Sequence, residues 1–257
     1  MIKKLFYPFG EVNKKTKTLI IIIWIVIALG WFELGHSKLI PPPSKIAVSL
    51  WSLVNSTKFY DELVASLITT LKAMGVSILL TIVIVYSSTI QVFSPIAEFV
   101  SKCRYLTLTG LVFVFTVISD NLADVKMYLL IFGITPFFVT SFLSVVKSTP
   151  PQQIQKGYVN RLGRWGTLYE VIIIGKLDIL LEVMRQNFAI SWMMITMVEG
   201  YAMNEGGIGT LLIKSNKYLN LAPVFAMLVV IFTLGLTADI VLGKLREFLF
   251  PYVKTKK

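Results

Sequence analysis

Few residues in this sequence can carry chemistry on their own. Among 257 residues there is one cysteine, Cys103, and one histidine, His36. A single cysteine excludes an intrachain disulfide, and a single histidine cannot by itself build a histidine metal site or a catalytic dyad. The chain also lacks a Gly-x-x-x-x-Gly-Lys-Ser/Thr phosphate loop, so we expect no ATP site and no metal site within it.

Acidic residues are also scarce, with 14 Asp and Glu against 25 Lys and Arg, and the net charge is +11. The basic residues flank apolar runs instead of lining one polar domain, which argues against nucleic-acid binding. Hydrophobic residues make up 55% of the chain, the mean hydropathy is +0.74, and several apolar runs approach the ~20 residues that cross a bilayer. The composition therefore predicts an all-α, polytopic membrane protein.

We expect about six transmembrane helices, at residues 19–34, 63–86, 106–118, 127–146, 179–199 and 221–242. They would form a single transmembrane domain over residues 19–250, between a basic segment at 1–18 and a basic tail at 251–257. On this topology 18 of the 25 Lys and Arg lie on the side that holds both termini. The positive-inside rule then predicts a multi-pass protein with both termini in the cytoplasm.

The main polar interruption is residues 148–176, between the fourth and fifth expected spans. Thr149 can cap a helix there, with Pro150 at the first helical position and Gln152 completing a capping box. Gly163 then divides the stretch into two short amphipathic pieces. One acid, Glu170, stands against four basic residues, Lys156, Arg161, Arg164 and Lys176. The pattern predicts a structured cytoplasmic loop that is presented to a partner, although the same charges would also satisfy the positive-inside rule alone.

The order of these features resembles the permease subunit of a binding-protein-dependent ABC importer, in the nitrate, sulfonate and taurine branch. The resemblance covers residues 20–251. It rests on a Pro-Pro-Pro-Ser segment at 41–44, the turn 119–121, the basic loop with Gly163, and Trp192, Glu199 and the Gly-Ile-Gly run at 207–209. In that family the loop carries Glu-Ala-Ala before its glycine, whereas this chain has Gly157, Tyr158 and Val159 there. The difference suggests a divergent docking surface or a matching change in the partner.

The resemblance implies a type I ABC importer permease, a homodimer or heterodimer in the inner (plasma) membrane. Two cytoplasmic ABC ATPase subunits, which would bind ATP and Mg²⁺, would dock on residues 150–170 of the loop. A periplasmic or lipid-anchored solute-binding protein would deliver a small solute to the outer face. The remaining contacts would be to membrane lipid, and we expect no nucleic-acid partner and no enzymatic activity in this chain.

Within the loop, Tyr158 and Trp165 are large amphipathic anchors of the kind that dominate interface energetics. Arg161 and Arg164 can pair with acidic residues of the ATPase. The full set of residues expected to couple the two subunits is Pro151, Gln155, Gly157, Tyr158, Arg161, Gly163, Arg164 and Trp165.

The translocation path should be lined by polar residues of the spans, and the candidates are Thr69, Lys72, Thr135, Ser191, Thr196 and Glu199. A lysine on the path would suit an anionic solute. The alternative is that the hydroxyl groups bond helix to helix and that Lys72 reaches outward or pairs with an acid. The Gly-rich run at 206–209 is expected to form a tight external turn.

Two other classes of protein stay open. A secondary transporter or channel often shows inverted repeats, and none is evident here. A membrane-embedded transferase needs clustered Asp, Glu or His at a membrane face, and Asp120 and Asp124 are the only close aspartate pair. Transport driven by an ion gradient without ATP would favour the first class, and activity without any ATPase partner would favour the second.

Overall fold

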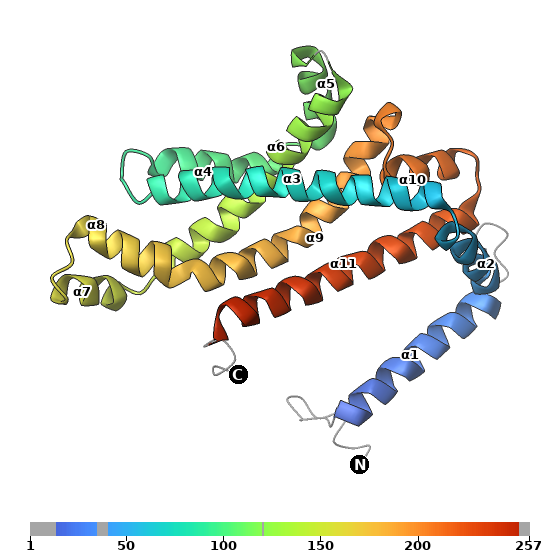
Figure 1. The fold of residues 1–257 in the computed structure, drawn as a ribbon, viewed down its shortest axis with the longest axis horizontal. Helices are drawn as coiled ribbons and strands as arrows, with labels where there is room; N and C mark the ends of the chain where they lie inside the picture. The colour runs from blue at the N-terminus through green and yellow to red at the C-terminus, as the bar shows by residue number, and fades with distance from the viewer. Residues whose placement is uncertain (1–13, 35–40, 120, 252–257) are drawn as a thin grey trace.

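The computed structural model describes residues 14–34, 41–119 and 121–251, and within these ranges it contains helices and no β-strand. The expected all-α fold is therefore confirmed. Figure 1 shows long helices crossing one another in an elongated bundle, with the segment between α6 and α9 at one end. His36, Asp120, most of the basic N-terminal segment and all but the first residue of the basic tail lie outside the described ranges.

Among the described residues five helices are longer than 20 residues: α1 (Lys14–Leu34), α3 (Thr57–Ser87), α6 (Leu122–Lys147), α9 (Leu177–Tyr201) and α11 (Leu221–Leu249). The shorter helices connect them: α2 (Pro43–Val54), α4 (Ser94–Lys102), α5 (Leu108–Ile118), α7 (Pro151–Val159), α8 (Arg164–Thr167) and α10 (Ile208–Lys217). Helix α1 begins at Lys14, so the described end of the basic segment is already helical.

Within the described ranges three helical segments are long and apolar enough to cross a membrane: Thr57–Ser87, Ala123–Lys147 and Leu221–Leu249. By the same measure Ser94–Tyr105 and Leu108–Ile118, which are bent by 109° at their junction, would count as a fourth span if they are taken together. The span expected at 106–118 is therefore not confirmed by itself, because α5 has 11 residues and reaches only about 16 Å. Helix α9 has 25 residues but carries Asp178, Glu182, Arg185 and Glu199, and it does not belong to the three.

Helix α6 lies at the centre of the bundle. Its largest buried side chains follow at helical spacing and are fully enclosed: Leu129, Leu130, Ile134, Phe138 and Phe142. The buried side of α3 is lined by small residues, Ser66, Thr70, Ala73, Ser77 and Thr81, which allow close helix packing. Helix α1, in contrast, lies apart from the bundle and contacts only α2 closely, and its Trp24 is 68% exposed (Figure 1).

Candidate functional site

The expected cytoplasmic loop is a helical hairpin, which we call the 148–176 hairpin. Helix α7 and the turn at 160–163 lead into α8, which continues through a π-helical turn at Leu168–Ile173 and a 3₁₀ turn at Ile174–Lys176 into α9. The hairpin occupies one end of the bundle (Figure 1). The break around Gly163 thus divides two helical pieces, as the sequence indicated.

The predicted start of α7 is wrong by one residue. Pro150 is the N-cap, Pro151 is the first helical residue, and no side chain caps the helix. The reason is that Pro151 disfavours a helical conformation at the residue before it, so Pro150 is extended, with φ −61° and ψ 138°. Thr149 is buried instead, and its hydroxyl donates back to the Val145 carbonyl at 3.5 Å.

Helix α7 ends in a Schellman motif that has an unexpected residue at its left-handed position. The Leu162 N–H donates to the Gly157 carbonyl and the Arg161 N–H donates to the Tyr158 carbonyl, both at 3.0 Å. Arg161 has φ +61°, a conformation that glycine adopts at low cost and that costs other residues about 1 kcal/mol or more. Arginine therefore occupies a position where the backbone favours glycine.

Gly157 and Gly163 of the hairpin have different roles. Gly163 has φ −62° and ψ 172°, and a side chain there would meet nothing within 4 Å, so neither its backbone nor its surroundings require glycine. Gly157 is buried, and an added Cβ would lie 2.7 and 2.8 Å from side-chain atoms of Thr167. Close contact of α7 with α8 therefore depends on Gly157.

A first prediction tests this difference. Gly157→Val should force α7 away from Thr167 and loosen the hairpin, whereas Gly163→Val should leave it intact because its side chain enters open space. Limited proteolysis of the purified protein should show faster cleavage within 148–176 for Gly157→Val only. Equal cleavage rates for both variants would contradict the assigned role of Gly157.

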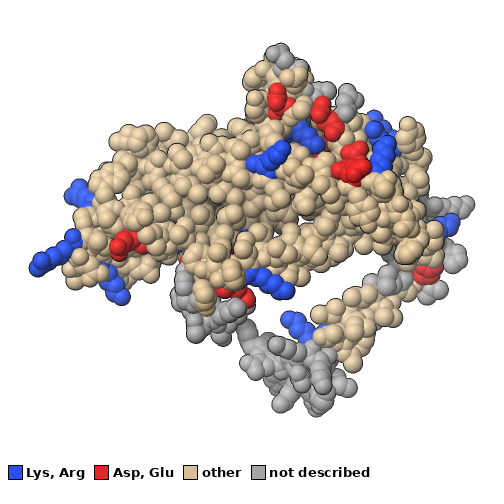
Figure 2. Space-filling model, in the orientation of Figure 1, with Lys and Arg blue, Asp and Glu red and all other residues tan. Residues whose placement is uncertain are grey.

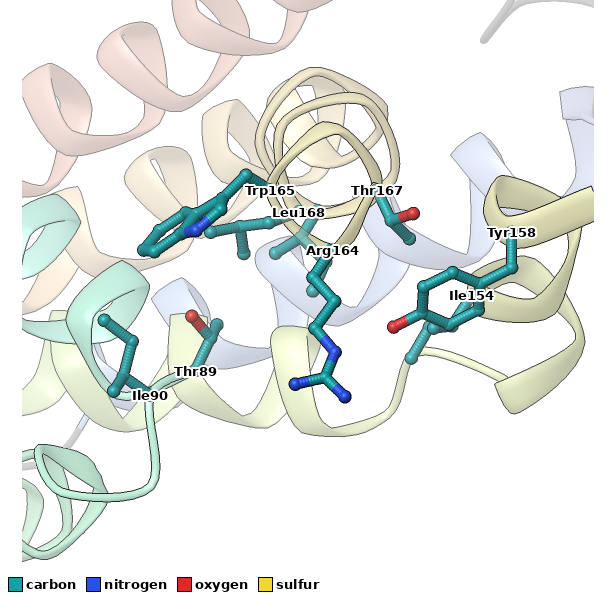
Figure 3. Close-up of a pocket in the computed structure, with 9 residues that line it drawn as sticks. Thr89, Ile90, Ile154, Tyr158, Arg164, Trp165, Thr167 and Leu168 are labelled. Carbon is teal, nitrogen blue, oxygen red and sulfur yellow. The ribbon is translucent and has the colours of Figure 1, made fainter. Parts of the chain in front are cut away.

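A groove of about 450 Å³ runs along the hairpin, and Figure 3 shows the side chains that line it. Ile154 and Tyr158 border it from α7, Trp165 and Arg164 from α8, and the turn after α3 closes it with Thr89 and Ile90. The Arg164 side chain extends between these walls. Tyr158 is 51% exposed and Trp165 is 70% exposed, so two large aromatic side chains are presented on one surface.

The structure thus brings Tyr158, Arg164 and Trp165 of the expected coupling set to one groove. Pro151, Gln155, Arg161 and Gly163 are exposed elsewhere on the hairpin, and Gly157 is buried. Figure 2 shows basic side chains at the hairpin end of the molecule and a second group of charges near α10 and the start of α6, with much of the surface between them uncharged.

The second candidate site is a buried carboxylate, Glu199, near the end of α9. The side chain is fully buried and receives three donors: Lys126 Nζ at 2.9 Å, Ser66 Oγ at 2.7 Å and the Gly209 N–H at 3.0 Å. These donors come from α6, α3 and α10, so four helices meet at one carboxylate. Lys126 is itself 8% exposed. A buried charge is tolerated only with such partners, and removing one of them is strongly destabilising.

The glycine run at 206–209 is shaped by this carboxylate. Gly206 and Gly207 have φ of +71° and +106°, which confirms the expected tight turn. Three consecutive N–H groups at the start of α10 then meet side chains, because Gly207 donates to Glu62 Oε2, Ile208 to Ser66 Oγ and Gly209 to Glu199. A Cβ at Gly207 would overlap the Glu199 carboxylate. The turn therefore connects α9 to α10 and also binds the carboxylates of Glu62 and Glu199 through its backbone N–H groups.

The other expected path residues do not gather around Glu199. The hydroxyls of Thr69, Thr135, Ser191 and Thr196 donate to carbonyls three or four residues earlier in their own helices. Lys72 is exposed on α3. No hydrogen bond or ion pair joins any two of the six candidates in the described part of the chain.

Sequence reasoning missed the partners of Glu199. Lys126 was expected in an external loop, but α6 begins at Leu122 and buries it one turn later. Glu62 and Ser66 received no role, although they stand four residues apart and so share one face of α3. The available signal was Glu199 itself, because an acid inside an apolar helix requires a partner.

A third charged cluster joins α9 to α11 on the hairpin side. Arg246 donates to Glu182 at 2.6 Å, and Arg185 donates to Asp239 at 2.9 Å and to Glu182 at 3.4 Å. These contacts explain how the polar first turns of α9 are accommodated. They also join α11 to α9, the helix that directly follows the hairpin.

A comparison with protein-family models and with curated proteins found no match for this chain. The part of the chain that the structure describes defines an all-helical class of protein, with three apolar helices able to cross a membrane, or four if the bent pair is one span. That class is the one expected of a membrane protein.

Proposed function

We propose that this chain is the permease subunit of an ABC importer, and that a separate ATPase docks on the 148–176 hairpin to drive transport of a small solute. In this proposal the six spans include α1 and α9, both termini are cytoplasmic, and the subunit works as a dimer in the inner membrane. A solute-binding protein supplies the substrate, and ATP and Mg²⁺ bind to the ATPase.

The observation that carries the proposal is the exposed hairpin with its aromatic groove. The hairpin ends the bundle, and its Tyr158 and Trp165 are half or more exposed around a groove that no described segment fills. Buried aromatic anchors in pockets dominate the binding energy of protein interfaces. The chain has no phosphate loop and so no ATP site of its own. In this proposal the free energy for transport comes from a partner, and a helical element seated in that partner can convert its closure into motion of the helices.

The side chain of Arg161 supports the same proposal. Its left-handed conformation is shared by Leu219, so what distinguishes Arg161 is a charged side chain kept where glycine would cost less. Arg161 is exposed and makes no ion pair within the described residues. We therefore assign its guanidinium to the contact with the ATPase, where it would pair with an acidic residue.

The substitution Arg161→Gly tests this assignment. It should stabilise the isolated chain by about 1 kcal/mol, because glycine relieves the left-handed strain, while it weakens recovery of an ABC ATPase encoded by a neighbouring gene. The measurements are thermal unfolding of the chain and co-purification of the tagged subunit after co-expression. Leu219→Gly is a matched control, since Leu219 has φ +54° at the same position of a second Schellman motif after α10.

Leu219→Gly should stabilise the chain similarly and leave co-purification unchanged. Undiminished ATPase recovery with Arg161→Gly would contradict the role of Arg161. Failure of the unaltered chain to retain any ATPase, together with uptake driven by an ion gradient alone, would overturn the importer proposal in favour of a secondary transporter or channel.

A further inference from the structure

The hairpin and the Lys126–Glu199 pair lie at opposite ends of the same two helices. Lys126 lies near the start of α6, which ends at Lys147 directly before the hairpin, and Glu199 lies near the end of α9, which begins at Leu177 directly after it. Each path covers about 30 Å at 1.5 Å per residue. The two helices are therefore joined covalently through the hairpin at one end and by an ion pair at the other.

The contact between these helices is otherwise apolar. The ion pair is the single polar side-chain link between α6 and α9 in the described structure. Between the two ends Gly133 of α6 lies against Met194 of α9, where an added Cβ would be 3.2 Å from the Met194 sulfur. An apolar contact can slide or separate gradually, whereas separation at Glu199 would leave a buried carboxylate without its counter-charge.

We propose that Lys126 and Glu199 form a latch that holds α6 and α9 together at the end opposite the hairpin, and that this latch opens when the hairpin is moved. The role in transport rests on the proposed function, because the ATPase would supply the movement. The latch itself is a property of this chain and can be tested without the partner.

The test measures whether the end of α6 opens when the pair is neutralised. In a Cys103→Ser background, Leu129→Cys places one thiol on α6, three residues from Lys126, at a position that is 1% exposed. The protein is placed in lipid nanodiscs, where both membrane faces are accessible, and the rate of labelling by a water-soluble maleimide is measured. Glu199→Gln and the double change Lys126→Met with Glu199→Gln remove the ion pair, while glutamine can still accept the Ser66 and Gly209 hydrogen bonds.

Both changes should raise the labelling rate of the thiol about tenfold or more. The matched control is Lys147→Met, which removes a lysine of the same helix from a pair with Glu98 that is about half exposed on both sides, and it should leave the rate unchanged. An unchanged rate in folded Glu199→Gln and double variants overturns the latch, as does an equal rise with Lys147→Met. If neither variant folds, the proposal is also overturned, because an ion pair that is required for folding is a permanent structural contact and not one that opens and closes.

The outcome separates this inference from the proposed function. Labelling in nanodiscs involves this chain alone, so a negative result leaves the co-purification of an ATPase by the hairpin untouched. Conversely, a working latch in a chain that retains no ATPase would point to a transporter moved by another energy source.

Discussion

Replacing Gly207 by valine is expected to prevent the chain from reaching its folded structure. Gly207 has φ +106°, which a β-branched residue does not adopt, and its Cβ would overlap the Glu199 carboxylate. Displacing that carboxylate would separate it from Lys126 and from Ser66. Breaking a buried ion pair costs about 3–5 kcal/mol, against a total stability of about 5–15 kcal/mol for a typical protein.

The measurement is the yield of monodisperse protein in detergent, followed by thermal unfolding monitored by circular dichroism. Gly163→Val is the control, because Gly163 has a common backbone conformation and open space around it. We expect Gly163→Val to unfold at the same temperature as the unaltered chain. If Gly207→Val did the same, the turn at 206–209 would not be held against Glu199 as the structure places it.

Removing the two aromatic side chains of the hairpin groove is expected to abolish binding of the ATPase. The double change Tyr158→Ala with Trp165→Ala deletes two exposed anchors that face one groove. Hot-spot residues of this kind each contribute about 2 kcal/mol or more, so the dissociation constant should rise by a factor of several hundred. The chain should keep its stability, because neither side chain is buried.

This prediction has a closely matched control at the other end of the molecule. Trp51 on α2 and Tyr60 on α3 are 72% and 47% exposed, similar to Trp165 and Tyr158. The double change Trp51→Ala with Tyr60→Ala should leave binding of the ATPase unchanged when it is measured by titration of the purified ATPase in nanodiscs. If both double variants lost affinity for the ATPase equally, binding would depend on exposed aromatic area in general and not on the hairpin groove.

The sequence predicted the helical class because long apolar runs are a local signal. They can be recognised without knowing which distant residues they contact. It also located the polar hairpin, whose start depends on two adjacent prolines and whose break lies near Gly163. It misplaced the first residue of α7, since Thr149 has cap chemistry but Pro151 restricts the residue before it. The bend of 109° between α4 and α5 had no comparable local signal.

What the sequence by itself determined is therefore local: which segments are apolar and where the chain turns. Only the tertiary structure decided which partners Glu199 takes. Lys126 lies 73 positions earlier in the chain, and Ser66 lies 133 positions earlier, so nothing in their neighbouring residues marks them. The choice follows from packing α3, α6, α9 and α10 around one carboxylate, because a charge withdrawn from water is stable only where every helix that encloses it supplies a donor.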